Sequence, residues 1–186
     1  LMIHNGQKLN VKSTGLIEWL KNCKKQNIVK SFGASIYQDT FLPELILKEL
    51  DFVQIPYSLF NTEVEKNGIV KLCLKNKVQI HIRSIFCQGI ILCEPDKLPL
   101  WCEQKDKVIL EEIKKLGINS KVKMIDLACS YVQSKDWVNS ILIGLTSIKE
   151  LKEISKSFAK KVVFDFRKID KLSINFSQKL LDPRRW

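Results

Sequence analysis

Short apolar runs alternate along the chain with longer stretches in which apolar residues recur at helical spacing. The apolar runs are too short for helices and are bounded by polar or turn residues, so we expect each to be a strand buried on both faces. The predicted strands are Leu1–Ile3, Ser31–Ala34, Phe52–Ile55, Val78–Ile82 and Ser140–Ile143. The longer stretches predict helices, namely Gly15–Cys23, Glu44–Leu50, Glu63–Asn76, Val108–Leu116, Lys121–Ser134 and Ile148–Phe158.

Three of these helices have a clear inward face; in Lys121–Ser134 it consists of Met124, Leu127, Ala128 and Tyr131. In the first, Leu16, Leu20 and Cys23 fall on one side, and Ser13 or Thr14 can cap its start. The third is expected to run without a break over residues 63–76. Its expected inward residues are Val64, Ile69, Leu72 and Cys73.

The alternation of strands and helices predicts parallel strands joined by helical crossovers. Two architectures fit this order: a doubly wound open sheet and a (β/α) barrel. The chain has no Gly-x-Gly-x-x-Gly and no P-loop, so nothing favours the dinucleotide-binding open sheet. A length of 186 residues predicts a single domain.

Composition excludes several classes of protein. Hydrophobic residues make up 45% and charged residues 27%, which is typical of a globular chain. No apolar run approaches the roughly 20 residues that a membrane span needs, and the N-terminal residues do not resemble a signal peptide. We therefore expect a cytoplasmic protein that does not enter a membrane.

The cysteines and the net charge both favour the simpler interpretation. No two of the six cysteines form a Cys-x-x-Cys pair and only two histidines are present, so we expect buried, reduced thiols and no metal site. The formal charge of +11 comes from lysines spread along the chain. Because no basic stretch is interleaved with aromatics, we expect a solvated surface and no nucleic-acid partner.

Polar residues follow each of the five predicted strands. Since the carboxyl ends of parallel strands share one edge of a sheet, we expect these side chains to surround a common polar pocket. A core alone needs none of this polarity. The residues are His4, Ser35, Tyr37, Gln54, Tyr57, Arg83, Ser84, Phe86, Gln88, Gly144, Thr146 and Ser147.

From Leu1 to about Phe158 the sequence resembles the aldo/keto reductases. Five segments match in order: Leu1-Met-Ile-His-Asn the end of the family's fourth strand, Phe32-Gly-Ala-Ser-Ile-Tyr the fifth, Phe52-Val-Gln-Ile-Pro-Tyr-Ser-Leu-Phe-Asn the sixth, His81-Ile-Arg-Ser-Ile-Phe-Cys-Gln-Gly the seventh, and Ile141-Leu-Ile-Gly-Leu-Thr-Ser-Ile-Lys-Glu-Leu the eighth with its helix. The resemblance implies the C-terminal half of a (β/α)8 TIM barrel, N-terminally truncated, with residues 159–186 as an extension packing on it.

The resemblance also implies a role for each strand-end residue. Ser35 and Gln54 match residues that hold the nicotinamide carboxamide, and Arg83 matches a planar side chain that stacks on the nicotinamide ring. His4 matches the catalytic histidine that orients the substrate carbonyl. Ile36 stands where the family often has Asn.

The remaining matched residues belong to the phosphate and adenosine end of the cofactor. Ser84, Phe86 and Gln88 match residues that line the pyrophosphate, and Thr146 and Ser147 match the adenosine-phosphate end, where a helix N-terminus suits an anion. Members that prefer NADPH usually have basic residues near this point, whereas this chain has Gly144 and Glu150. A carboxylate repels a 2′-phosphate, so the expected cofactor is NADP or NAD without a preference for NADPH.

The implied activity is the interconversion of a small-molecule carbonyl and an alcohol. The family's acid tyrosine and the lysine and aspartate that depress its pKa lie before the fourth strand, so we expect the isolated chain to be inactive; neither Tyr37 nor Tyr57 matches that tyrosine. A non-catalytic module that binds a nucleotide or a partner is the alternative. A different (β/α) enzyme with His4 as its base is a third possibility.

Overall fold

The computed structural model describes residues 1–160 and 162–186, which form two compact units. The first, here called the sheet unit, comprises Leu1–Pro56, Glu63–Arg83 and Asp136–Leu142. The second, here called the helical unit, comprises Tyr57–Thr62, Ser84–Lys135 and Ile143–Trp186.

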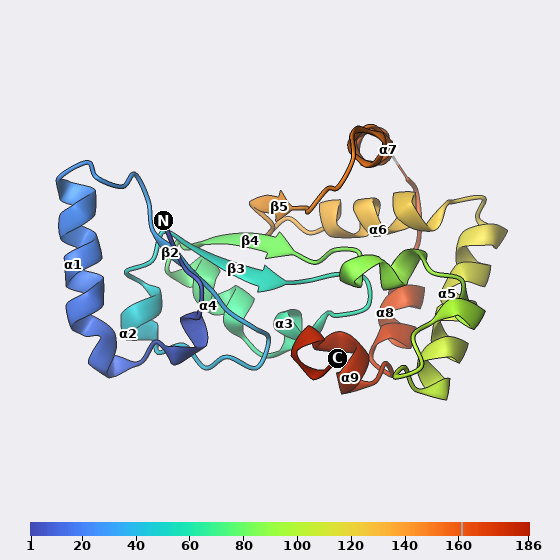
Figure 1. The fold of residues 1–186 in the computed structure, drawn as a ribbon, viewed down its shortest axis with the longest axis horizontal. Coiled ribbons are helices and arrows are strands. Elements are labelled where there is room, and N and C mark those ends of the chain that lie inside the picture. Colours follow the sequence, from blue (N-terminus) through green and yellow to red (C-terminus); the bar gives the residue numbers. More distant parts are fainter. Residues whose placement is uncertain (161) are drawn as a thin grey trace. The chain divides into compact units, whose positions relative to one another are not determined.

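The sheet unit contains one five-stranded parallel sheet in the order β1-β2-β3-β4-β5 (Figure 1). This confirms the predicted fold class, an α/β chain with parallel strands and helical crossovers. The strands are β1 (Met2–Ile3), β2 (Gly33–Ser35), β3 (Phe52–Pro56), β4 (Gln79–Arg83) and β5 (Ser140–Leu142). The crossover helices of this unit are α1 (Thr14–Lys25), α2 (Glu44–Leu47), α3 (Glu63–Lys66) and α4 (Ile69–Lys75).

The two faces of the sheet differ in polarity because successive side chains along a strand point to opposite faces. One face is apolar and buried. The fully buried residues of this face in β2, β3 and β4 are Ala34, Val53, Ile55, Ile80 and Ile82. On the opposite face, strand pairing aligns four polar residues in one row across the sheet, namely Ser35, Gln54, His81 and Ser140.

The expectation of strands buried on both faces holds for β2 and for nearly all of β3, and it is wrong for β4, where only Ile80 and Ile82 are buried, and for the edge strands. All three residues of β2 are buried, whereas β5 exposes Ser140 and Leu142, and β1 exposes Met2. An edge strand has only one neighbour, which leaves its outer side uncovered. Asn139 nevertheless secures β5, because its Oδ1 accepts a hydrogen bond from the Ile80 N–H at 2.7 Å.

Two helix predictions need correction. In α1 the buried residues are Ile17, Leu20 and Cys23. Leu16 is exposed, because the next residue, Ile17, faces the core in its place. The helix expected over residues 63–76 is broken into α3 and α4 at Gly68, whose φ of +86° is left-handed. Glycine adopts this conformation without steric cost, so it separates the two helices.

The helical unit contains α5 (Gln104–Asn119), α6 (Met124–Gln133), α7 (Ile148–Ala159), α8 (Arg167–Ser173) and α9 (Gln178–Leu181). The 3-10 turns η3 (Cys87–Leu92) and η4 (Pro95–Lys97) precede them. The first three helices were predicted with shifted ends, but α8 and α9 were not. They lie in the predicted extension 159–186, of which residue 161 is outside the described residues.

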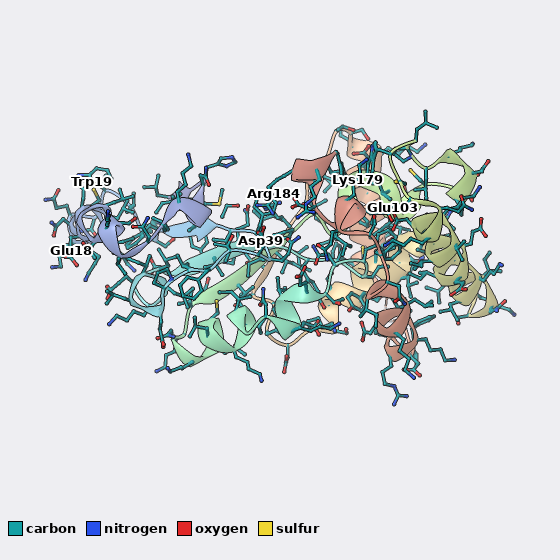
Figure 2. All side chains as sticks on the ribbon, turned by 90° about the horizontal axis from the view of Figure 1, so that it is seen from below. Glu18, Trp19, Asp39, Glu103, Lys179 and Arg184 are labelled. Atoms are coloured by element: carbon teal, nitrogen blue, oxygen red, sulfur yellow. The ribbon has the colours of Figure 1, made fainter. Side chains whose placement is uncertain are left out.

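Buried polar contacts tie the C-terminal segment into the helical unit. The fully buried Asp106 of α5 accepts hydrogen bonds from the Ser177 N–H and hydroxyl, both at 2.7 Å. The Tyr131 hydroxyl of α6 donates to Asp170 of α8 at 2.5 Å. In Figure 2 these two elements can be located by Glu103, at the N-terminus of α5, and by Lys179, in α9.

Candidate nucleotide-binding residues

In the sheet unit, two predicted site residues contact each other at the ends of neighbouring strands. Ser35 ends β2 and pairs in register with Gln54 of β3, which brings both side chains to the same face. The Ser35 hydroxyl donates to Gln54 Oε1 at 3.3 Å, and the two residues are 7% and 8% exposed. The two side chains together present a hydroxyl and an amide in a largely desolvated position.

Arg83 ends β4, two residues beyond His81 on the same face of the sheet. Its guanidinium carbon lies 4.7 Å from the centroid of the Tyr37 ring, which follows β2. A tight turn holds the Tyr37 backbone, because its N–H donates to Thr40 Oγ1 and its carbonyl accepts from the Thr40 N–H, both at 3.0 Å. The planar cation and the aromatic ring therefore form a stack at the strand ends.

His4 follows β1 and is exposed. The next residues of its turn pack closely on β2: a Cβ added to Gly6 would lie 2.7 Å from the Ser35 carbonyl oxygen and 2.8 Å from Ile36. Only glycine permits this approach. The turn that carries His4 thus lies beside the end of the strand that carries Ser35.

In the helical unit, the segment after β4 has an unusual backbone. Ser84 and Gln88 have φ values of +61° and +53°, in the left-handed region that non-glycine residues rarely adopt. The Cys87 N–H donates to the Ser84 carbonyl and the Gly89 N–H to the Phe86 carbonyl, both at 2.9 Å. The segment is therefore a tight turn that exposes Gln88 and leaves Ser84 and Phe86 half-buried.

The start of α7 differs from the simple anion site that the sequence predicts. The Glu150 carboxylate accepts from the Thr146 N–H and from the Thr146 hydroxyl, each at 2.8 Å. The Ser147 hydroxyl accepts from the Glu150 N–H at 3.2 Å and caps the helix. The hydrogen bond from the Thr146 backbone lowers the pKa of Glu150 below its ordinary value. Gly144 is exposed and precedes this cap.

The predicted site residues thus fall into two groups. The sheet unit contains His4, Ser35, Gln54 and Arg83; the helical unit contains Ser84, Phe86, Gln88, Gly144, Thr146 and Ser147. Within the sheet unit, Ser35 and Gln54 are in contact. Within the helical unit, Thr146 and Ser147 share the Glu150 cap. The roles assigned to all ten remain predictions.

His81, to which the sequence analysis assigns no role, lies in register with Gln54 on the polar face of the sheet. Its ring stacks on Phe52 with centroids 4.7 Å apart, and Nε2 lies 3.2 Å from Gln79 Oε1. Burial lowers the pKa of His81 below its ordinary value. The alternation of Gln79, His81 and Arg83 with isoleucines was the available signal, since period-two polarity indicates one polar face.

Neither metal ligation nor membrane insertion finds support among residues 1–160 and 162–186. No group of three or more His, Cys, Asp or Glu side chains in this part of the chain is arranged to hold a metal ion. No helix there combines the length and apolar character that crossing a membrane requires. The six cysteines are free thiols, and Cys23, Cys73, Cys87 and Cys129 are buried.

The fold is similar to that of solved aldo-keto reductases. Aldo-keto reductase AKR11C1 from Bacillus halodurans superimposes with TM-scores of 0.72 in the apo form and 0.71 in the holo form, at 17% and 18% identity. These matches cover 97% of this chain and 64% and 63% of the reductase. Glycerol dehydrogenase AKR11B4 from Gluconobacter oxydans gives 0.70 at 18% identity, covering 98% and 60%. The chain therefore spans less than two thirds of these proteins.

The sequence itself carries the family assignment. No curated protein sequence matches the chain significantly. The sequence model of the aldo/keto reductase family matches residues 9–174. This range includes the last four of the five segments that resemble the family's strands. The chain belongs to the aldo/keto reductase family.

Proposed function

We propose that this chain provides the nicotinamide-binding strand ends of an NAD(P)H-dependent oxidoreductase that interconverts a small-molecule carbonyl and an alcohol. The buried contact between Ser35 and Gln54 carries the proposal. Burying a hydroxyl and an amide is unfavourable unless both form hydrogen bonds. Their mutual contact uses the hydroxyl hydrogen of Ser35 and the amide oxygen of Gln54, so the hydroxyl oxygen can still accept and the amide nitrogen can still donate. A carboxamide, with an N–H donor and a carbonyl acceptor, is complementary to this pair.

Arg83 supports the same assignment. A guanidinium is planar and can stack on aromatic groups, and Tyr37 already lies over it. We infer that the nicotinamide ring joins this stack while Ser35 and Gln54 fix its carboxamide, which selects the face of the ring that offers hydride. The bound cofactor supplies the hydride; the chain's residues hold and orient the ring.

We propose further that the general acid that protonates the carbonyl oxygen during reduction comes from outside these 186 residues. The sequence has three tyrosines. Tyr57 and Tyr131 are fully buried, and Tyr37 lies on Arg83. The open edges of β1 and β5 also suit pairing with further strands, because an exposed edge offers unpaired N–H and C=O groups. An isolated chain that binds nucleotide without catalysis also fits the alternative of a non-catalytic module.

The test is a titration of the purified chain with NADH and with NADPH, followed by tryptophan fluorescence, alongside an assay of NADH oxidation with several aldehydes. We expect binding that weakens roughly tenfold in Gln54→Leu, the effect of one or two lost hydrogen bonds. Binding should stay unchanged in Gln26→Leu, an exposed residue at the end of α1. Failure of NADH and NADPH to bind would refute the cofactor assignment, and steady NADH oxidation would refute the external acid.

A further inference from the structure

We propose that the charge on the His81 imidazole determines how strongly the strand ends prefer the reduced nicotinamide ring over the oxidised ring. The oxidised ring carries a positive charge and the reduced ring is neutral, so a nearby cation disfavours only the oxidised form. This inference rests on the proposed function and adds to that site a residue that selects between the two forms of the cofactor. His81 acts through its charge, without contact with the ring.

Strand pairing places His81 close to the residues proposed to hold the nicotinamide. His81 of β4 pairs in register with Gln54 of β3, so the two side chains leave the same face of neighbouring strands, whose backbones lie about 4.8 Å apart. Arg83 follows two residues later on that face, about 7 Å along the strand. These separations are shorter than the Debye length of about 8 Å at physiological ionic strength, so a charge on His81 reaches a ring bound between Gln54 and Arg83.

The surroundings of the imidazole accommodate both of its charge states. The ring stacks on Phe52, with centroids 4.7 Å apart and an angle of 7° between the planes, and Nε2 lies 3.2 Å from Gln79 Oε1. The face of an aromatic ring attracts a cation, and the amide oxygen can accept a hydrogen bond from an Nε2–H in either state. His81 is half-buried, so protons reach it from solvent.

The groups around His81 leave it as the titrating charge of this region. Its partners across the strands, Gln54 and Ser140, are uncharged. Arg83 on the same strand keeps its proton at every pH used below and so gives a constant background. The helix α4, which packs on β4, turns Ile69, Val70 and Cys73 inward, and burial raises the pKa of the Cys73 thiol to about 12.

The direction of the pH dependence follows from the burial of His81. Burial disfavours the imidazolium and lowers the pKa of His81 below its ordinary value of 6.5. The ring is therefore neutral above pH 6.5 and gains its charge as the pH falls through the lower folded pKa. The oxidised cofactor should accordingly be bound well at neutral pH and lose affinity in acid, while the reduced cofactor keeps its affinity.

The experiment measures dissociation constants of NAD⁺ and NADH at pH 8 and at pH 5, promptly after mixing because NADH decomposes in acid. The ratio of the two constants cancels the effects of pH on the parts that both forms share. The variant His81→Asn keeps a polar side chain that is neutral at both pH values. Its matched control adds Gln26→His, which restores a titrating imidazole at an exposed position at the end of α1. Circular dichroism checks that each variant is folded.

We expect the preference of the unsubstituted chain for NADH over NAD⁺ to rise roughly fivefold from pH 8 to pH 5, through weaker NAD⁺ binding. In His81→Asn, with or without Gln26→His, the preference should change by less than about twofold. A preference independent of pH in the unsubstituted chain, or the same rise in His81→Asn, would overturn the role of His81 while leaving the proposed function intact. Binding of neither form would overturn both.

The reverse effect of the cofactor on His81 gives a second readout, because linkage between two binding events is reciprocal. The chain has two histidines, so the imidazole resonance that disappears in His81→Asn identifies His81. Saturation with NAD⁺ should lower the pKa of His81 by about 0.7, which is the same fivefold effect, and NADH should leave it nearly unchanged. An equal change with both forms would contradict recognition of the charge on the ring.

Discussion

The strand ends of the sheet unit and the start of α7 in the helical unit both carry residues matched to cofactor binding, but different forces hold them. Backbone pairing aligns Ser35 with Gln54 and leaves the side chains a weak mutual contact. At α7 the side chains themselves hold the structure, because Thr146 donates twice to Glu150. A side chain placed by backbone pairing stays available to a ligand, whereas one that caps a helix is already engaged.

The largest expected effect concerns the pairing of β2 with β3, which places Ser35 beside Gln54. A Cβ at Gly33 would lie 2.2 Å from the Phe52 carbonyl oxygen and 2.6 Å from its ring. Gly33→Val therefore must separate β2 from β3, and we expect a loss of about 4 kcal/mol or more in the free energy of unfolding. Urea unfolding followed by circular dichroism measures it.

The matched control for this substitution is Gly15→Ala in α1. No heavy atom lies within 4 Å of a Cβ at Gly15, and alanine favours a helix more than glycine does. We expect Gly15→Ala to stabilise the protein by about 0.5–1 kcal/mol. If the two substitutions were equally destabilising, close pairing at Gly33 would not be what holds Ser35 beside Gln54.

The next largest effect concerns Asp106, a side chain of the helical unit that already accepts several hydrogen bonds. Asp106 is fully buried and accepts from the Ser177 N–H, the Ser177 hydroxyl and the Glu103 N–H. Asp106→Ala leaves these donors unsatisfied, so we expect a loss of about 2–3 kcal/mol in unfolding free energy. The exposed Asp96→Ala is the control, expected to change stability by less than about 0.5 kcal/mol. Equal effects in a urea titration would contradict this role of Asp106.

Sequence reasoning located the strands and their polar ends because both depend on local patterns. The five apolar runs and the polar residues that follow them placed Ser35, Gln54 and Arg83 at strand ends, and strand pairing puts Ser35 beside Gln54. The break at Gly68 was missed because the apolar spacing continues across it. The helices α8 and α9 are held by distant partners, namely Tyr131 for α8 and Asp106 for the Ser177 cap of α9, which a local pattern does not reveal.

The cap on α7 shows a different limit of the sequence. Ser147 followed three residues later by Glu150 is the spacing of a capping box, so the signal was present. The carboxylate, however, accepts from Thr146, one residue before the cap residue. Binding a phosphate and binding Glu150 are two uses of the same donors that have the same sequence signature, and only the folded structure distinguishes them.

The smallest effect is a pH dependence confined to the second region. The folded pKa of Glu150 is lowered, so its cap contributes fully above the ordinary value of about 4.5 and is lost as the pH falls through the lower folded value. We expect the Thr146 amide resonance to titrate below pH 4.5 and amide exchange in the first turn of α7 to quicken there. Glu150→Gln should abolish that titration. A Thr146 resonance that titrates equally in the variant would exclude Glu150 as its cause.

The most direct test of the account uses nicotinamide mononucleotide, which has the nicotinamide but no adenosine. We predict that its addition shifts the backbone amide resonances at the ends of β2 and β3, including Ser35 and Gln54, without shifting those of Thr146 to Glu150. The shifts should disappear in Gln54→Leu and persist in Gln26→Leu. Shifts absent from both strand ends, or undiminished in Gln54→Leu, would contradict the claim that these paired strands present the nicotinamide site.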